Sequence, residues 1–255
     1  MLTSATDFVN HKDIRPIAGE ARLRWLRGTR QLDVMHPRLV QRMLKTTAGI
    51  SGEQGKAVAL HELVKTLPFG CVPDYSALRA SDVLALGYGD CFSKGMLFVA
   101  MLRAAQIPAR LRFVSLPVGF LYGIVDLQEA TIMHAMCEVL IHERWCVTDS
   151  YVPDTRLQTS ACRLLRAQSK LVGYGVHLRG HQTWDGIHDA SAQCFAGDAG
   201  SMPVVDWGVA DDPESFYADE NHSELRRNFA ARLKWRLAAP LVNKRVAAVR
   251  QTPAA

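Results

Sequence analysis

The sequence lacks the features that mark membrane, secreted and disulfide-bonded proteins. It has no run of about 18 apolar residues, which a transmembrane helix would need. The first residues, MLTSATDFVNHKD, carry charges where a secretion signal requires an apolar stretch. The six cysteines form no CxxC pair, so without a secretion signal they are interpreted as free thiols. We therefore expect a cytoplasmic protein with no membrane partner.

The charge balance is also too modest to identify a partner. The formal net charge is +5, and the basic excess is concentrated late in the chain, which does not favour nucleic-acid binding. With 255 residues, of which 48% are hydrophobic, the chain can bury a sizeable core. We expect residues 1–255 to form a single domain.

The most informative stretch is GYGDCFSKGMLFVAMLRAAQIPAR, residues 87–110. Gly87 and Gly89 permit a tight turn, Asp90 can cap a helix, and apolar residues then recur with a helical period until Pro108. This pattern places Cys91 in the first turn of the helix. There the free backbone N–H groups and the positive end of the helix dipole favour the thiolate over the thiol. Cys91 is therefore the candidate nucleophile.

A second informative stretch, residues 134–152, has the pattern of a β-hairpin. If Ile141 pairs with Arg144 across a two-residue turn, His134 and Asp149 lie on one face as diagonal neighbours, about 7 to 8 Å apart at Cβ. Cys137, Val139 and Cys146 then point to the opposite face, where structural cysteines are expected.

Cys91, His134 and Asp149 together fit the roles of nucleophile, base and orienting carboxylate. Each residue alone has an ordinary structural explanation, so the interpretation depends on the three occurring together. His177, His181 and His188 lie in loop-like sequence without a supporting cysteine or carboxylate spacing. We therefore predict no metal and no cofactor.

The remainder of the chain carries weaker signals. Residues 156–222 are expected to be an irregular extension in which LQTSACRLLRAQ (157–168) can form a helix, and residues 223–250 a basic helical tail that Pro240 splits into two helices. The tail is interpreted as a peripheral helix with solvated arginine and lysine side chains. An interaction surface for acidic partners remains the alternative.

Residues 87–113, followed by His134 with Glu138 and by Trp145 with Asp149, resemble the core of the transglutaminase-like superfamily, which includes papain-like enzymes. The resemblance runs from about residue 35 to 155, and GYGVHL (173–178) and DDPESFY (211–217) extend it towards bacterial single-domain members. Two departures are Met136, where many members have an aromatic residue, and a hairpin turn without glycine. Neither changes the three candidate residues.

The resemblance implies an α+β fold in which Cys91 begins a central helix packed on an antiparallel sheet that carries His134 and Asp149. It also implies acyl transfer through a thioester, with a peptide, amide or small acyl compound as the substrate. We expect a cysteine peptidase or amidase, with an amine-using acyltransferase as one alternative and a non-catalytic scaffold as another. Phe69, Tyr75 and Tyr88 are all open as a second oxyanion donor, and the oligomeric state is not predicted.

Overall fold

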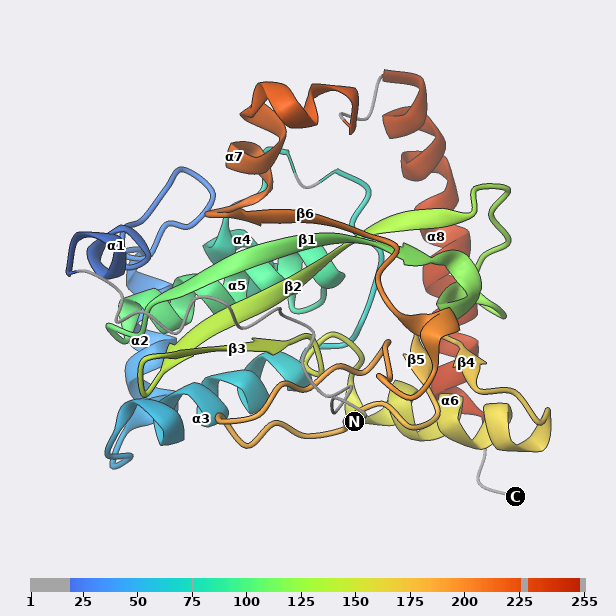
Figure 1. The fold of residues 1–255 in the computed structure, drawn as a ribbon, viewed down its shortest axis with the longest axis horizontal. Coiled ribbons are helices and arrows are strands. Elements are labelled where there is room, and N and C mark those ends of the chain that lie inside the picture. The colour runs from blue at the N-terminus through green and yellow to red at the C-terminus, as the bar shows by residue number, and fades with distance from the viewer. Residues whose placement is uncertain (1–18, 75, 226–228, 253–255) are drawn as a thin grey trace, which may run out of the picture.

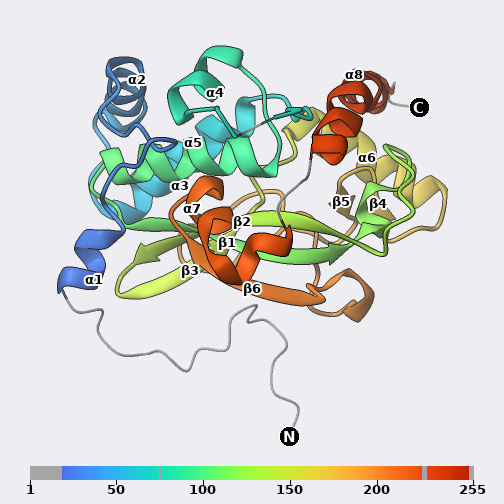
Figure 2. The same cartoon turned by 90° about the horizontal axis from the view of Figure 1, so that it is seen from above.

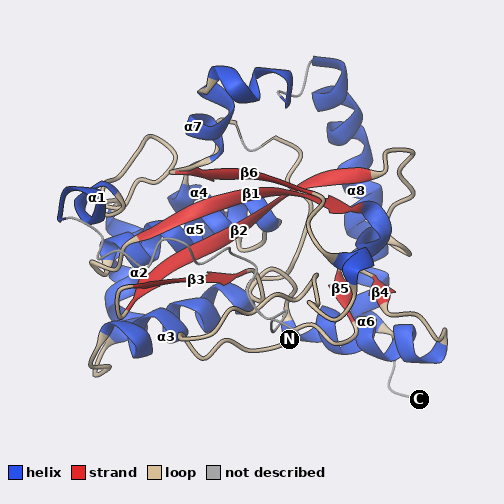
Figure 3. Ribbon diagram, in the orientation of Figure 1, coloured by secondary structure: helices blue, strands red, loops and turns tan. Residues whose placement is uncertain are grey.

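The computed structural model describes residues 19–74, 76–225 and 229–252. Helices α1 to α5 precede the first strand, and the later part of the chain contains both strands and helices (Figures 1 and 3). The helices are α1 (Gly19–Arg24), α2 (Pro37–Thr47), α3 (Glu53–Thr66), α4 (Ala80–Leu86), α5 (Cys91–Ala104), α6 (Thr155–Ala167), α7 (Pro213–Ala218) and α8 (Phe229–Gln251), with the short 3-10 helices η1 (Val118–Leu121), η2 (Ala199–Ser201) and η3 (Glu220–Leu225). The strands are β1 (Ala109–Pro117), β2 (Thr131–Ile141), β3 (Arg144–Thr148), β4 (Val172–Gly173), β5 (Val176–His177) and β6 (Val205–Ala210). The part of the chain that the structure describes contains no helix that could span a membrane.

The main sheet has four strands in the order β3-β2-β1-β6, and every neighbouring pair is antiparallel. Helices α2 to α5 lie together against one face of this sheet (Figure 2). The predicted α+β class, with a central helix on an antiparallel sheet, is confirmed.

Helix α5 lies at the centre of the core. Every residue from Phe92 to Arg103 is buried, so the helix is enclosed on all sides and not only along one apolar stripe. One face of the sheet packs against it through the odd-numbered residues of β1 and β2, such as Leu111, Phe113 and Cys137. This packing fixes the start of α5 relative to the sheet.

The opposite face of the sheet carries a smaller cluster that includes Val114, Met136 and Val147. Cys194 and Met202, from the segment between β5 and β6, pack against these side chains. The segment between β5 and β6 therefore covers the face of the sheet opposite to α5.

Two expectations about the later half are wrong. The helix expected within residues 157–168 is present as part of α6, but the rest of 156–222 is not simply irregular, because it contains the strand β6 and α7, and β6 extends the main sheet beside β1. Helix α8 also continues through Pro240 without a break in its assignment. Ala239, Val242, Val246 and Val249 are buried on both sides of the proline, and this packing holds the helix together where one backbone hydrogen bond is lost.

Candidate active site

The turn before α5 fixes the position of Cys91. Helix α4 ends at Gly87, whose φ of 72° lies in the left-handed region that glycine tolerates best. A Cβ atom at Gly89 would lie 2.5 Å from the Ser93 hydroxyl, so only glycine fits this close approach. Asp90 caps α5 by accepting hydrogen bonds from the N–H groups of Ser93 and, across the turn, Val72, both at 3.0 Å. Cys91 is therefore the first residue of the helix, as predicted.

The hairpin has the predicted register, with Ile141 opposite Arg144 and Cys137 opposite Thr148. Its turn residues, His142 and Glu143, both have positive φ, which is the conformation of a two-residue type I′ turn. The turn adopts this conformation without the glycine that usually favours it. Asp149 follows the last residue of β3 directly.

His134 and Asp149 are both buried, and His134 Nε2 lies 2.9 Å from Asp149 Oδ2. This bond occupies Nε2 and leaves Nδ1 as the other ring nitrogen. Burial lowers the pKa of His134, but the negative charge of Cys91 and the hydrogen bonds to Asp149 and Cys91 raise it more, to about 10. The environment therefore favours a protonated imidazole.

A loop far along the chain holds the Asp149 carboxylate. Oδ1 accepts a hydrogen bond of 2.8 Å from the Ala192 N–H, and Oδ2 accepts one of 3.1 Å from the Ser191 hydroxyl. The Asp149 N–H in turn donates to the Ala190 carbonyl at 3.1 Å. Sequence reasoning missed these residues, because an irregular loop has no periodicity that would place it beside a strand end 40 residues earlier.

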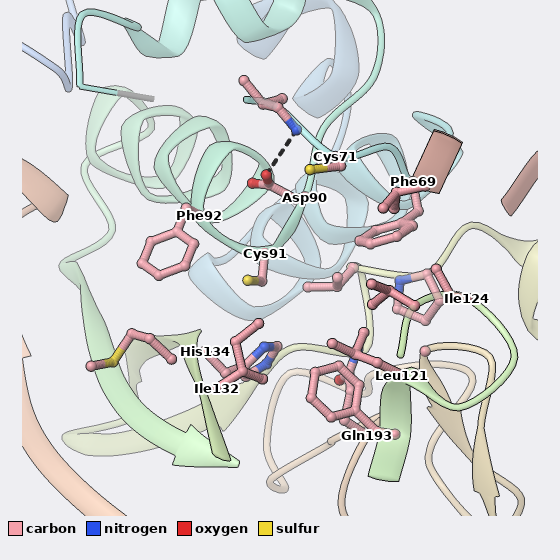
Figure 4. A pocket seen from close by; sticks show the side chains of 18 of the residues that line it. Phe69, Cys71, Asp90, Cys91, Phe92, Leu121, Ile124, Ile132, His134 and Gln193 are labelled. Atoms are coloured by element: carbon pink, nitrogen blue, oxygen red, sulfur yellow. Dashed lines mark hydrogen bonds between the residues drawn. The ribbon is translucent and has the colours of Figure 1, made fainter. Parts of the chain in front are cut away.

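A cavity lies between the start of α5 and the sheet (Figure 4). Cys91 and His134 both line it, and Gln193 lies on the same side of it as His134. The other lining residues are mainly apolar and come from segments near Phe69, from η1 and β2, and from α6 and α8, whose contributions are Leu157 from α6 and Trp235 and Val242 from α8.

The three aromatic residues considered as oxyanion donors are not equivalent. Phe69 lines the cavity, but its N–H donates to Asp154 Oδ2 at 2.9 Å. Tyr88 packs over Gly70 and does not line the cavity. Tyr75 lies outside the described residues. None of the three is therefore assigned.

Helix α8 forms part of the cavity wall, so the interpretation of the tail as a peripheral helix is wrong for its buried face. The Asn243 carboxamide binds both backbone groups of Cys71, with distances of 2.7 and 3.1 Å. Arg250 binds Asp154 and also donates to the Phe69 carbonyl at 2.9 Å. Polar side chains thus attach α8 to two segments that line the cavity.

His177, His181 and His188 each have a different hydrogen-bond partner. His177 pairs with Asp198 at 3.1 Å, His188 pairs with Asp185 at 2.7 Å, and the N–H of His181 donates to the Ser191 carbonyl. Within residues 19–74, 76–225 and 229–252, no group of three or more His, Cys, Asp or Glu side chains is arranged to hold a metal ion.

Comparison with known structures yields distant similarities only. A candidate cysteine protease from Cytophaga hutchinsonii matches with a TM-score of 0.41 and 21% identity, covering 51% of this chain and 41% of that one. A candidate protease from Parabacteroides distasonis matches with a TM-score of 0.35 and 17% identity, covering 51% of this chain and 26% of that one. The match thus spans about two fifths of the first structure and about a quarter of the second. No curated protein matches the chain.

The match to a family model is more informative. Residues 39–150 match the model of the transglutaminase-like superfamily, and this segment contains Cys91, His134 and Asp149. The match supports cysteine-dependent catalysis in general terms, and it agrees with the resemblance that the sequence motifs indicate. Over residues 39–150, the chain is therefore similar to the transglutaminase-like superfamily.

Proposed function

We propose that the protein is an enzyme that transfers an acyl group through a thioester on Cys91, with hydrolysis of a peptide or amide bond as its reaction. The observation that carries the proposal is that Cys91, at the start of α5, shares a cavity with His134, whose Nε2 is bound to Asp149. Nucleophile, base and orienting carboxylate are the three groups that such chemistry needs.

In the first step, the Cys91 thiolate attacks the carbonyl carbon of the substrate and the C–S bond forms. The Cys91 N–H has no acceptor within its helix and can donate to the oxyanion, as helix geometry dictates for the first turn. The protonated His134 then gives its proton to the leaving nitrogen as the C–N bond breaks. The products of this step are a free amine and an acylated Cys91.

In the second step, water attacks the thioester while neutral His134 accepts its proton. The C–S bond breaks, and the acid product leaves with the thiolate and imidazolium restored. Asp149 holds the imidazole in one orientation and stabilises its charged form throughout.

The same three groups serve an amine acceptor equally well, so a transamidase or amide-forming acyltransferase is the alternative. The test is to incubate the protein with cell extract, quench with acid, and identify the acyl group on the Cys91 peptide by mass spectrometry. The trapped mass would identify the acyl donor. Adding a labelled amine to the same reaction distinguishes water from an amine as the acceptor. If amine incorporation is faster than hydrolysis, the proposed hydrolase activity is contradicted.

A non-catalytic scaffold predicts a different result. Its Cys91 would react with iodoacetamide at pH 6 to 7 no faster than an ordinary thiol, whose pKa is about 8.5. The proposed enzyme requires selective alkylation of Cys91 over the other cysteines, four of which are buried.

A further inference from the structure

The cavity beside Cys91 offers almost no partner for a charged ligand. Its wall is formed by apolar side chains such as Leu121, Ile132, Val152 and Val242. Among the described residues no lysine or arginine lines it, and Asp90 already accepts hydrogen bonds from the helix that it caps and from Val72. Apart from Cys91 and His134, which the proposed reaction uses, a charged group entering this cavity would lose its water and find no counter-ion, at a large cost in free energy.

Gln193 is the exception on this wall. Its side chain is buried, with 2% of the residue exposed, and within the described residues its Oε1 has no hydrogen-bond partner. Leaving a buried carboxamide oxygen unpaired is unfavourable in the empty protein, and a ligand with a suitable donor would remove that cost.

The backbone of Gln193 is fixed by the loop that holds Asp149. Its N–H donates to the Ser191 hydroxyl at 3.2 Å, and that hydroxyl donates to Asp149 Oδ2 at 3.1 Å. The unpaired carboxamide therefore has a defined position relative to the His134–Asp149 pair, on the same side of the cavity as His134 (Figure 4).

We propose that the acyl donor carries an uncharged, apolar group that fills this cavity, and that Gln193 hydrogen-bonds an amide of that same acyl group. A carboxamide both donates and accepts, as a peptide group does, so the two can pair. The substrate class is an N-acylated apolar amino acid or a peptide with an apolar residue at the cleaved bond. The inference rests on the proposed acyl transfer at Cys91.

The first test compares p-nitrophenyl esters of N-acetyl-phenylalanine, N-acetyl-lysine and N-acetyl-aspartate, with rates corrected for the Cys91→Ala variant. Attack by Cys91 forms the thioester and releases p-nitrophenolate, which is measured. We expect kcat/KM for the phenylalanine ester to exceed both charged esters by about a hundredfold. Equal acylation by all three esters would overturn the apolar assignment alone, whereas no acylation of Cys91 by any ester would overturn the proposed function as well.

The second test isolates Gln193. Esters of N-acetyl-phenylalanine and 3-phenylpropionate differ in the amide, and the wild-type protein should prefer the first by about tenfold. Gln193→Met keeps the side-chain length and removes the hydrogen bonds, so it should abolish most of this preference. A merely structural role would slow both esters equally and leave their ratio unchanged, and that result would contradict the assignment. The ratio is independent of how much of the variant folds.

The third test addresses the wall that α8 provides. Val242 lines the cavity, whereas its neighbour Leu241 does not line it and is 54% exposed. Val242→Ala should raise kcat/KM for the N-acetyl-tryptophan ester relative to the N-acetyl-alanine ester by about fivefold, because it enlarges the cavity. Leu241→Ala should leave this ratio unchanged. A Val242→Ala ratio equal to that of wild type would overturn the placement of the acyl group in this cavity.

Discussion

The segment that matches the superfamily, residues 39–150, and the segment that follows it contribute to the site in different ways. The first carries all three proposed reacting groups, Cys91, His134 and Asp149. The second carries none of them, yet Ser191 and Ala192 hold the Asp149 carboxylate and Val242 closes the cavity. Chemistry and its support thus come from different halves of the chain.

This division has a physical reason. A reacting group needs a rigid element, and α5 and the β2–β3 hairpin are anchored in the main core. The groups that orient it and shape the cavity need only to reach it, so a loop or a peripheral helix suffices. We therefore expect the first segment to determine the reaction, and the second to set its rate and its substrate. The predictions below test this difference.

The largest effect is expected from the first segment. Cys91→Ala removes the proposed nucleophile and should lower kcat/KM by about 10⁴-fold or more. The melting temperature should stay within about 2 °C of wild type, because one half-exposed sulfur at a helix start is lost. Cys162→Ala, in α6, should retain activity. If Cys91→Ala retains activity close to that of Cys162→Ala, the nucleophile assignment is refuted.

Asp149→Asn should have the next largest effect. The amide cannot stabilise the imidazolium, so kcat should fall by about a thousandfold while KM changes much less. Because the carboxylate helps to raise the pKa of His134 to about 10, wild-type activity should decline only as the pH rises through about 10. In the variant this alkaline decline should move to lower pH. A pH profile of kcat would measure both effects, and an unchanged rate would make Asp149 a structural hairpin residue.

Ser191→Ala tests whether the second segment supports the first. The substitution removes one hydrogen bond to Asp149 Oδ2, together with the acceptor for the Gln193 and Cys194 N–H groups, and leaves the bonds that Asp149 makes with Ala192 and His134. We expect kcat to fall by about five- to tenfold, the effect of one hydrogen bond to a charged group. Ser169→Ala, in the turn after α6, provides the matched control. Equal rates for the two variants would mean that the loop does not orient the carboxylate.

The sequence predicted the first segment well because its signals are local. A glycine turn, a capping aspartate and an apolar helix lie within residues 87–110, and the hairpin register follows from one two-residue turn. The resemblance of residues 39–150 to the transglutaminase-like superfamily, the α+β class and the start of α5 at Cys91 are confirmed. The catalytic roles, the single-domain organisation and the cytoplasmic location stay predictions.

The second segment was predicted poorly because its structure depends on contacts between residues distant in the chain. The strand β6 forms only by pairing with β1, about 90 residues earlier, and is short. The loop around Ser191 is ordered by Asp149 and has no pattern of its own. Pro240 marks a helix end by local rules, yet the burial of Ala239 before it and of valines after it keeps α8 continuous. Tertiary packing decides each of these cases.

The smallest effect on activity, but a measurable one on stability, is expected from the attachment of α8. Burial raises the pKa of Asp154, but the hydrogen bonds from Arg250, Leu157 and Phe69 lower it more, so its folded-state pKa lies below the usual range. The carboxylate therefore adds stability above the unfolded-state pKa of about 3.9, and this stability is lost as the pH falls through the folded-state pKa. Arg250→Met should cost about 2 kcal/mol of unfolding free energy at pH 7, since it leaves a largely buried carboxylate without its cation.

Urea titrations of Arg250→Met at pH 7 and below pH 4 would measure this cost and its dependence on pH. Arg236→Met, on the exposed side of the same helix, is the matched control and should change little. The difference between wild type and Arg250→Met should shrink at the lower pH, where Asp154 becomes protonated. A difference that is constant across pH would show that Arg250 stabilises α8 through the Phe69 carbonyl and its own packing, and not through Asp154. In that case the second segment would be attached to the cavity through the Phe69 carbonyl, and we would expect α8 to affect the substrate through the backbone near Phe69.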